Sequence, residues 1–202
     1  IFLLPLSHDE VVHGKHSIID KLWGTYEQKF AQLRCLYLYL FFHPGKKLSF
    51  MGNELAEFLE WSEEKQLGWN LLDYPAHQDF HRFMQKLGAL YQNHPALWEQ
   101  DYDSRFFRWL DMGQRFPETF SILRSSKDGK EVLMVMNLSD QPRTGYRLQS
   151  EEQSDYTLLL ASWQAAPKTL SSAPAACGWQ TIFDLPALSC AAFERTHPNA
   201  DE

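Results

Sequence analysis

The first part of the chain alternates between apolar and polar blocks, which predicts a strand, a helix and a second strand. Residues 1–6, IFLLPL, form a nearly continuous apolar run, typical of a strand buried on both faces of a parallel sheet. A helix is predicted over 25–42, where a polar side precedes an apolar second half and Pro44-Gly45 ends it. Residues 46–54, KKLSFMGNE, predict a second strand. Polar residues follow each strand, which is the βα order of a parallel sheet or barrel.

A long connection and a second helix follow. Residues 55–75 carry Trp61 and Trp69 and exceed the usual length of a βα loop, which favours a segment that covers a site. Between residues 80 and 91, apolar positions recur at intervals of three and four. They predict a helix with one buried face that ends before Pro95.

Near residue 100 the pattern changes to short runs of β type separated by turn residues. We predict strands over 105–110, 120–124, 131–139, 144–149, 155–162, 180–185 and 187–194. Asp128-Gly129 predicts a type I′ hairpin turn, because this pair tolerates positive φ angles. The segment 163–178, rich in Ala, Pro and Ser, is expected to be a surface loop. Short strands with turns between them indicate an antiparallel β-sandwich.

These elements divide the chain into residues 1–98 and residues 99–202. The first part supplies only two βα units, whereas a (β/α)8 barrel closes with eight units over about 250 residues. We therefore expect an α/β plus all-β fold, in which the last two βα units of a (β/α)8 barrel precede an antiparallel β-sandwich. The chain opens without a start methionine or a basic leader. The earlier barrel strands are accordingly expected upstream of Ile1.

Composition and charge narrow the classes of partner. Hydrophobic residues make up 44% and aromatic residues 14% of the 202 positions, enough for packed cores. The net charge of −7 argues against a nucleic acid or an anionic membrane as a partner. Cys35, Cys177 and Cys190 are widely spaced and suit neither a disulfide framework nor a zinc site, so we expect reduced thiols in a cytoplasmic protein.

The segment PLSHDEVVHGKHS at residues 5–17 offers histidines for a metal site and carboxylates for catalysis. A zinc-peptidase helix needs histidines four residues apart. His8 and His13 are five residues apart, a rotation of about 140° along a helix, so they do not share a face. His13 and His16 are three apart and could share one, but Gly14 lies between them and the sequence specifies no third ligand. We therefore expect no metal and no other cofactor.

Carboxylates follow both predicted strands. His8, Asp9 and Glu10 come where the first strand ends, and Asn53 and Glu54 where the second ends. In a parallel barrel these ends converge on the substrate, and anionic groups there suit glycoside chemistry with its oxocarbenium-like transition state. A solvated cap without chemistry is the alternative, and spacing alone leaves both open.

Three segments resemble the 1,4-α-glucan (glycogen) branching enzymes of the α-amylase family: LPLSHDEVVHGK, PGKKLSFMGNELAEFLEW and DYDSRFFRWLD. The resemblance implies that Asp9 stabilises the transition state and that His8 binds the donor sugar. It also implies substrate contacts for Glu10, Glu54 and Trp61. Support of the site by Glu54 and packing of Trp61 under a loop are the alternatives.

The resemblance further implies a retaining transfer of a glucan chain to a sugar 6-hydroxyl, with amylose and glycogen as substrates. In that family the nucleophile and the general acid belong to earlier barrel strands, and neither motif is present here. We expect a glycosyltransferase whose other part is the N-terminal remainder of the same enzyme, and no activity from the 202 residues alone. The alternatives are a non-catalytic glucan-binding or scaffold remnant and a sister hydrolase of the α-amylase family.

The later tryptophans have two interpretations. Trp109, Trp163 and Trp179 are candidates for stacking on sugar rings, but core tryptophans of a sandwich are the favoured interpretation.

Overall fold

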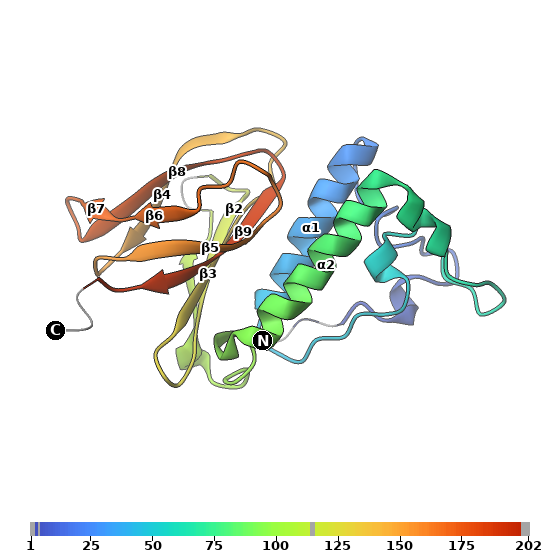
Figure 1. The fold of residues 1–202 in the computed structure, drawn as a ribbon, viewed down its shortest axis with the longest axis horizontal. Coiled ribbons are helices and arrows are strands. Elements are labelled where there is room, and N and C mark those ends of the chain that lie inside the picture. Colours follow the sequence, from blue (N-terminus) through green and yellow to red (C-terminus); the bar gives the residue numbers. More distant parts are fainter. Residues whose placement is uncertain (1–2, 4, 114–115, 199–202) are drawn as a thin grey trace.

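The computed structural model describes residues 3, 5–113 and 116–198, which form two α-helices packed on antiparallel sheets (Figure 1). Helix α1 spans Tyr26–Phe42 and α2 spans Pro75–Asn93. The strands are β1 (Phe107–Asp111), β2 (Thr119–Ser125), β3 (Glu131–Asn137), β4 (Arg143–Ser150), β5 (Asp155–Ala161), β6 (Thr169–Ser171), β7 (Ala173–Pro174), β8 (Trp179–Leu185) and β9 (Ser189–Thr196). Short 3₁₀ helices lie at His8–Glu10, Asn53–Leu55, Trp69–Asp73, Pro95–Leu97 and Ser104–Phe106. No helix in this described part is long and apolar enough to cross a membrane.

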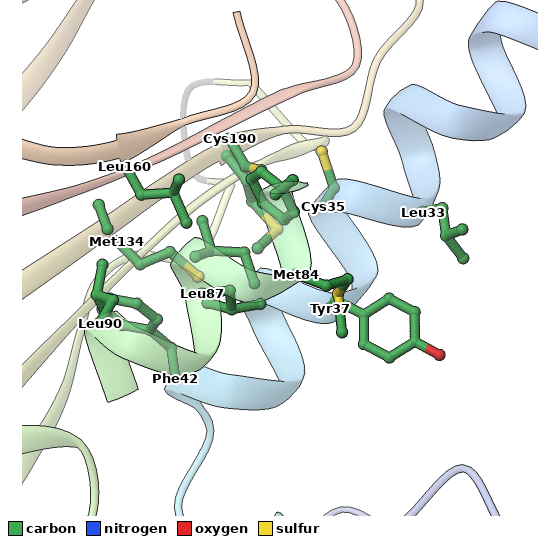
Figure 2. Close-up of a cluster of buried hydrophobic side chains, with 14 of the residues drawn as sticks. Leu33, Cys35, Tyr37, Phe42, Met84, Leu87, Leu90, Met134, Leu160 and Cys190 are labelled. Atoms are coloured by element: carbon green, nitrogen blue, oxygen red, sulfur yellow. The ribbon is translucent and has the colours of Figure 1, made fainter. Parts of the chain in front are cut away.

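Helix α1 confirms the prediction from its pattern and begins with a capping box. The Thr25 hydroxyl accepts from the Gln28 backbone N–H, and the Gln28 side chain accepts from the Thr25 N–H. Both faces of the helix are buried. Figure 2 shows Cys35 facing the sandwich, whereas Leu33 and Tyr37 lie on the side away from it. Because α1 is covered on both sides, it has no broad polar face exposed to solvent, which explains its apolar second half.

Helix α2 also confirms its prediction and has a single buried face. It begins at Pro75, whose fixed φ and missing N–H suit the first turn of a helix. Phe80, Met84 and Leu87 are buried at intervals of three and four residues, and the face opposite them is polar. The two helices run side by side across the sandwich (Figure 1).

The sandwich consists of two antiparallel sheets, as the strand pattern predicts. Within the described residues, one sheet has the order β1-β2-β3-β9-β5-β6 and the other β4-β8-β7. In β3, Leu133 and Val135 join the core between the sheets, and Val132, Met134 and Met136 join the core under the helices. The larger sheet is therefore buried on both faces, which explains the continuous apolar run in β3.

Two turn and loop predictions require correction. The segment 163–178 is not only a loop, because β6 pairs with β5 and β7 pairs with β8. At the β2–β3 turn, Gly129 has a positive φ of 81°, but Asp128 does not, so the turn is not type I′. The Gly129 N–H donates to the Ser126 carbonyl at 3.2 Å, and the resulting longer loop needs only one left-handed residue.

The two segments predicted as barrel strands run parallel, but they pair over a very short length. Leu6 and Ser49 form one parallel bridge, and the Asn53 side chain donates to the Leu6 carbonyl at 3.4 Å. No further strand lies beside them in the described residues. Such an isolated pair gains few hydrogen bonds, which explains why no regular strand forms in the described parts of the two segments. Residues 1, 2 and 4 of the first predicted strand lie outside the described residues.

A buried ion pair joins the end of α1 to the sandwich. Arg124 of β2 donates to the Phe42 carbonyl at 2.9 Å and to Asp101 at 3.1 Å, and both charged side chains are fully buried. Lys46 Nζ lies 3.6 Å from the other oxygen of Asp101. These contacts tie the end of α1 and the segment after α2 to the larger sheet.

Candidate functional site

The candidate site begins immediately after the parallel bridge at Leu6. There the chain turns through the 3₁₀ helix His8–Glu10, and His8 Nε2 lies 3.1 Å from Asp9 Oδ1. The side chains of His8 and Asp9 are 57% and 70% exposed, so both are available to a ligand. The Asn53 side chain donates to the Leu6 carbonyl at 3.4 Å, so the ends of the two predicted strands lie close together.

An open cavity of about 870 Å³ lies beside this turn. His8 and Trp61 are both in its wall, together with the loop after Val12 and the segment 58–65. Phe50 links the two side chains: its ring centroid is 6.1 Å from that of His8 and 5.3 Å from that of Trp61. The cavity wall thus provides aromatic surface next to an imidazole, and the Asp9 carboxylate lies 3.1 Å from that imidazole, a combination that suits a sugar ring.

Glu10 and Glu54 lie apart from this wall. Glu10 is exposed, and its carbonyl accepts from Lys21 Nζ. Glu54 is half-buried in the 3₁₀ helix Asn53–Leu55. Burial, and then the charge of Glu54, raise the pKa of Tyr37, whose buried hydroxyl has no hydrogen-bond partner in the described residues.

The loop that follows Glu10 is held by groups that the spacing of the sequence did not indicate. Glu60 accepts from the backbone N–H groups of Gly14 at 3.2 Å and His16 at 2.7 Å. These hydrogen bonds, that of His16 first, lower the pKa of the Glu60 carboxyl. The Lys15 ammonium donates to the Asp9 carbonyl at 2.7 Å. Glu60 directly precedes Trp61 in the sequence, but its partners lie more than forty residues away along the chain.

The histidines of this loop are not gathered around one point. His16 Nδ1 lies 2.9 Å from Asp20 Oδ2, and His13 is exposed. In the part of the chain that the structure describes, no group of three or more His, Cys, Asp or Glu side chains is placed to hold a metal ion.

Of the three later tryptophans, Trp109 and Trp163 lie against the cores. Trp109 packs on Phe107 at 5.7 Å and on Tyr39 and Phe120 at 6.4 Å between ring centroids. Trp163 packs against the core between the sheets. Both positions agree with the core interpretation. Trp179 lies in β8, where it pairs with Ser150 and Pro174.

Comparison with known proteins adds sequence relatives to this geometry. Residues 109–196 match the family described as alpha amylase, C-terminal all-beta domain. The chain is 47% identical over 148 residues to the 1,4-alpha-glucan branching enzyme GlgB of Aquifex aeolicus, which covers 73% of this chain and 24% of the relative. It is 48% identical over 147 residues to GlgB of Pseudomonas putida, covering 73% of this chain and 20% of the relative. The chain thus spans between a fifth and a quarter of these curated relatives.

Solved structures with the same fold include more distant proteins. The pneumococcal, multi-modular, glycogen-degrading virulence factor SpuA in a product complex matches with a TM-score of 0.61 at 15% identity, over 86% of this chain and 23% of that one. The α-amylase from H. orenii matches with a TM-score of 0.57 at 14% identity, over 94% of this chain and 38% of that one. At these identities the likeness describes the fold alone.

Proposed function

We propose, because residues 109–196 match the C-terminal all-beta domain of alpha amylases and the chain is similar to part of 1,4-alpha-glucan branching enzymes, that it contributes to a glucan-branching active site. The complete enzyme would cleave an α-1,4-glucan chain with retention and transfer it to a sugar 6-hydroxyl, which forms the α-1,6 branches of glycogen. The observation that carries the proposal is the exposed His8–Asp9 pair beside the aromatic cavity wall, at the end of a segment in parallel register with its neighbour.

The chemistry divides between this chain and the remainder of the enzyme. A retaining transfer needs a carboxylate nucleophile and a second carboxyl group that acts first as acid and then as base. In our proposal, both come from the N-terminal remainder. The Asp9 carboxylate stabilises the positive charge that develops on the donor sugar, and the His8 imidazole donates a hydrogen bond to the same sugar. The 202 residues alone are accordingly expected to be inactive.

The other assignments follow from position. Glu10, exposed at the same turn, would meet the acceptor chain. Trp61 would offer its ring to glucan in the cavity, next to Phe50. Glu54 would support the site from the second segment. We further propose that residues 1–98 are the end of the catalytic barrel, that residues 99–202 are the C-terminal sandwich, and that the enzyme is cytoplasmic with amylose and glycogen as substrates.

The test is Asp9→Ala in the complete enzyme, with Asp155→Ala, at the start of β5, as the matched control. We expect Asp9→Ala to lower turnover of amylose at least about a hundredfold, because charge stabilisation in the transition state is lost. Asp155→Ala should leave turnover unchanged, and circular dichroism should show an intact fold in both. Turnover of Asp9→Ala close to that of the wild type would refute the assignment.

Two further measurements separate the alternatives. Iodine staining of treated amylose, set against release of reducing ends, distinguishes branching from hydrolysis by a sister enzyme. Turnover of amylose by the purified 202-residue chain would contradict the division of the catalytic residues. Glucan binding without turnover, by a protein whose coding sequence starts just before Ile1, would favour a non-catalytic remnant.

A further inference from the structure

The loop from His13 to His16 has an unfavourable backbone conformation. His13, Gly14 and His16 have positive φ angles of 59°, 78° and 65°. Glycine adopts this left-handed region freely, but a side chain with a β-carbon is disfavoured there. Two histidines in the region within four residues therefore require contacts that hold the loop in place.

Glu60 supplies those contacts. Its Oε2 accepts from the Gly14 N–H at 3.2 Å and its Oε1 from the His16 N–H at 2.7 Å. Successive backbone N–H groups in a left-handed turn form a concave nest that favours an anion. Here the anion is a side chain of the protein itself, and hydrogen bonds to a charged acceptor are stronger than those to a neutral one. The adjacent Trp61 N–H donates to the Val11 carbonyl at 3.1 Å, which holds the start of the same loop.

A second contact connects this loop to the catalytic turn. Lys15 lies between the two residues that Glu60 holds, and its ammonium donates to the Asp9 carbonyl at 2.7 Å. A shift of the loop would therefore move the ammonium that holds the backbone of Asp9. The path from the Glu60 carboxylate to the Asp9 backbone thus consists of hydrogen bonds at its two ends, joined by the 14–16 backbone and the Lys15 side chain.

We propose that Glu60 is a positioning residue for Asp9: it fixes the 13–16 loop, and through Lys15 it places the turn that carries the Asp9 carboxylate. This proposal rests on the proposed function for the role of Asp9. The hold of Glu60 on the loop stands independently of that role. Two experiments therefore test it at separate points of the path.

The first experiment measures the loop in the complete enzyme. Trypsin cleaves after Lys15, and cleavage of a folded protein follows the population of the locally open state. We expect Glu60→Gln to raise the initial rate of cleavage after Lys15 about threefold to tenfold, and Glu60→Ala to raise it further, because the charged acceptor is lost. The control is Glu151→Gln, the same change at an exposed glutamate after β4, which should leave the rate unchanged. An unchanged rate in both Glu60 variants would overturn the hold on the loop.

The second experiment measures catalysis in the complete enzyme. We expect Glu60→Gln to lower kcat about tenfold with KM changed less than about twofold, because Asp9 acts on the transition state. The thermal midpoint should stay near that of the wild type, which separates this effect from partial unfolding. Lys15→Met should lower kcat similarly, and the double variant should be no worse than either single one, since both act on one path.

The outcomes are distinguishable. Additive losses in the double variant would overturn the path through Lys15, and an unchanged kcat in Glu60→Gln would overturn the positioning of Asp9. A wild-type enzyme that forms no branches would refute the proposed function and, with it, the positioning role. In that case the cleavage rate after Lys15 would still decide whether Glu60 holds the loop.

Discussion

Removal of either partner of the buried Arg124–Asp101 pair is expected to be strongly destabilising. Both side chains are fully buried, so Asp101→Asn leaves the Arg124 guanidinium without a compensating charge. Breaking one side of such a pair costs about 3–5 kcal/mol in the free energy of unfolding. The loss of stability in Arg124→Met should lie near the lower end of this range, because Lys46 Nζ remains 3.6 Å from Asp101 and still supplies a positive charge. The Phe42 carbonyl also loses its hydrogen-bond donor in this variant.

Removal of both charges together should cost less than removal of either one. Within the described residues, Arg124 Nε and Asp101 Oδ2 have no hydrogen-bond partner, so the pair is incompletely satisfied. Each unsatisfied buried polar atom costs about 1–3 kcal/mol, which offsets much of the attraction between the charges. We therefore expect the double variant Arg124→Met/Asp101→Leu to lose only about 1–2 kcal/mol, since apolar residues of similar volume often replace buried pairs at little cost.

Urea unfolding followed by tryptophan fluorescence measures these differences, with equal m-values as the condition for comparing them. Arg105→Met provides the matched control, because Arg105 pairs with Asp103 at the surface and should leave stability unchanged. Losses below about 1 kcal/mol in both single variants, or additive losses in the double variant, would refute the reasoning.

Three further variants test other parts of the fold. Burial lowers the pKa of Lys47 from 10.5 to about 8, so the folded state binds fewer protons than the unfolded state between these values. The free energy of unfolding of the wild type relative to Lys47→Met should thus rise between pH 8 and pH 10.5. We expect a rise of about 1–2 kcal/mol after allowance for the partial exposure of Lys47, measured by urea unfolding at each pH. Leu87→Ala, at a fully buried position, should cost about 2–5 kcal/mol by the same method, and a loss below 1 kcal/mol would contradict the packing of α2. Thr25→Ala should cost about 1 kcal/mol through the lost cap of α1, whereas Thr157→Ala, exposed in β5, should cost less.

Local sequence patterns predicted the helices and strands whose sequence signals lie within a few residues of each other. Both helices follow from apolar spacing together with nearby end signals, such as Pro44-Gly45 after α1 and Pro95 after α2. Strand β3 follows from its apolar run, although one sequence cannot indicate that the two faces of the strand serve different cores. The short strands β6 and β7 escaped prediction because their stability comes from pairing with β5 and β8, and not from their own Ala-, Pro- and Ser-rich sequence.

Part of the candidate site could likewise be predicted from the sequence, and part could not. The place of His8 and Asp9 after an apolar segment indicated the exposed turn that the structure describes, and the family resemblance supplied their roles. The contribution of Glu60 was not predictable, because its partners are backbone N–H groups near residue 14 and such contacts have no side-chain signature. Even the left-handed loop was only partly foreseeable, since Gly14 permits it but His13 and His16 do not favour it.

The core beneath the helices has a practical consequence for the construction of chimeric enzymes. The side chains of Cys35 and Leu87 from the helices and of Met134 and Cys190 from the sheet belong to one buried cluster (Figure 2). A recombination junction at residues 98–99 would combine two half-cores from different parents, and mismatched volumes in a close-packed interior are destabilising. A crossover before Thr25 would keep both helices with the sheet that they cover. Exchange of the sandwich between parents should therefore succeed only when α1 and α2 are transferred with it.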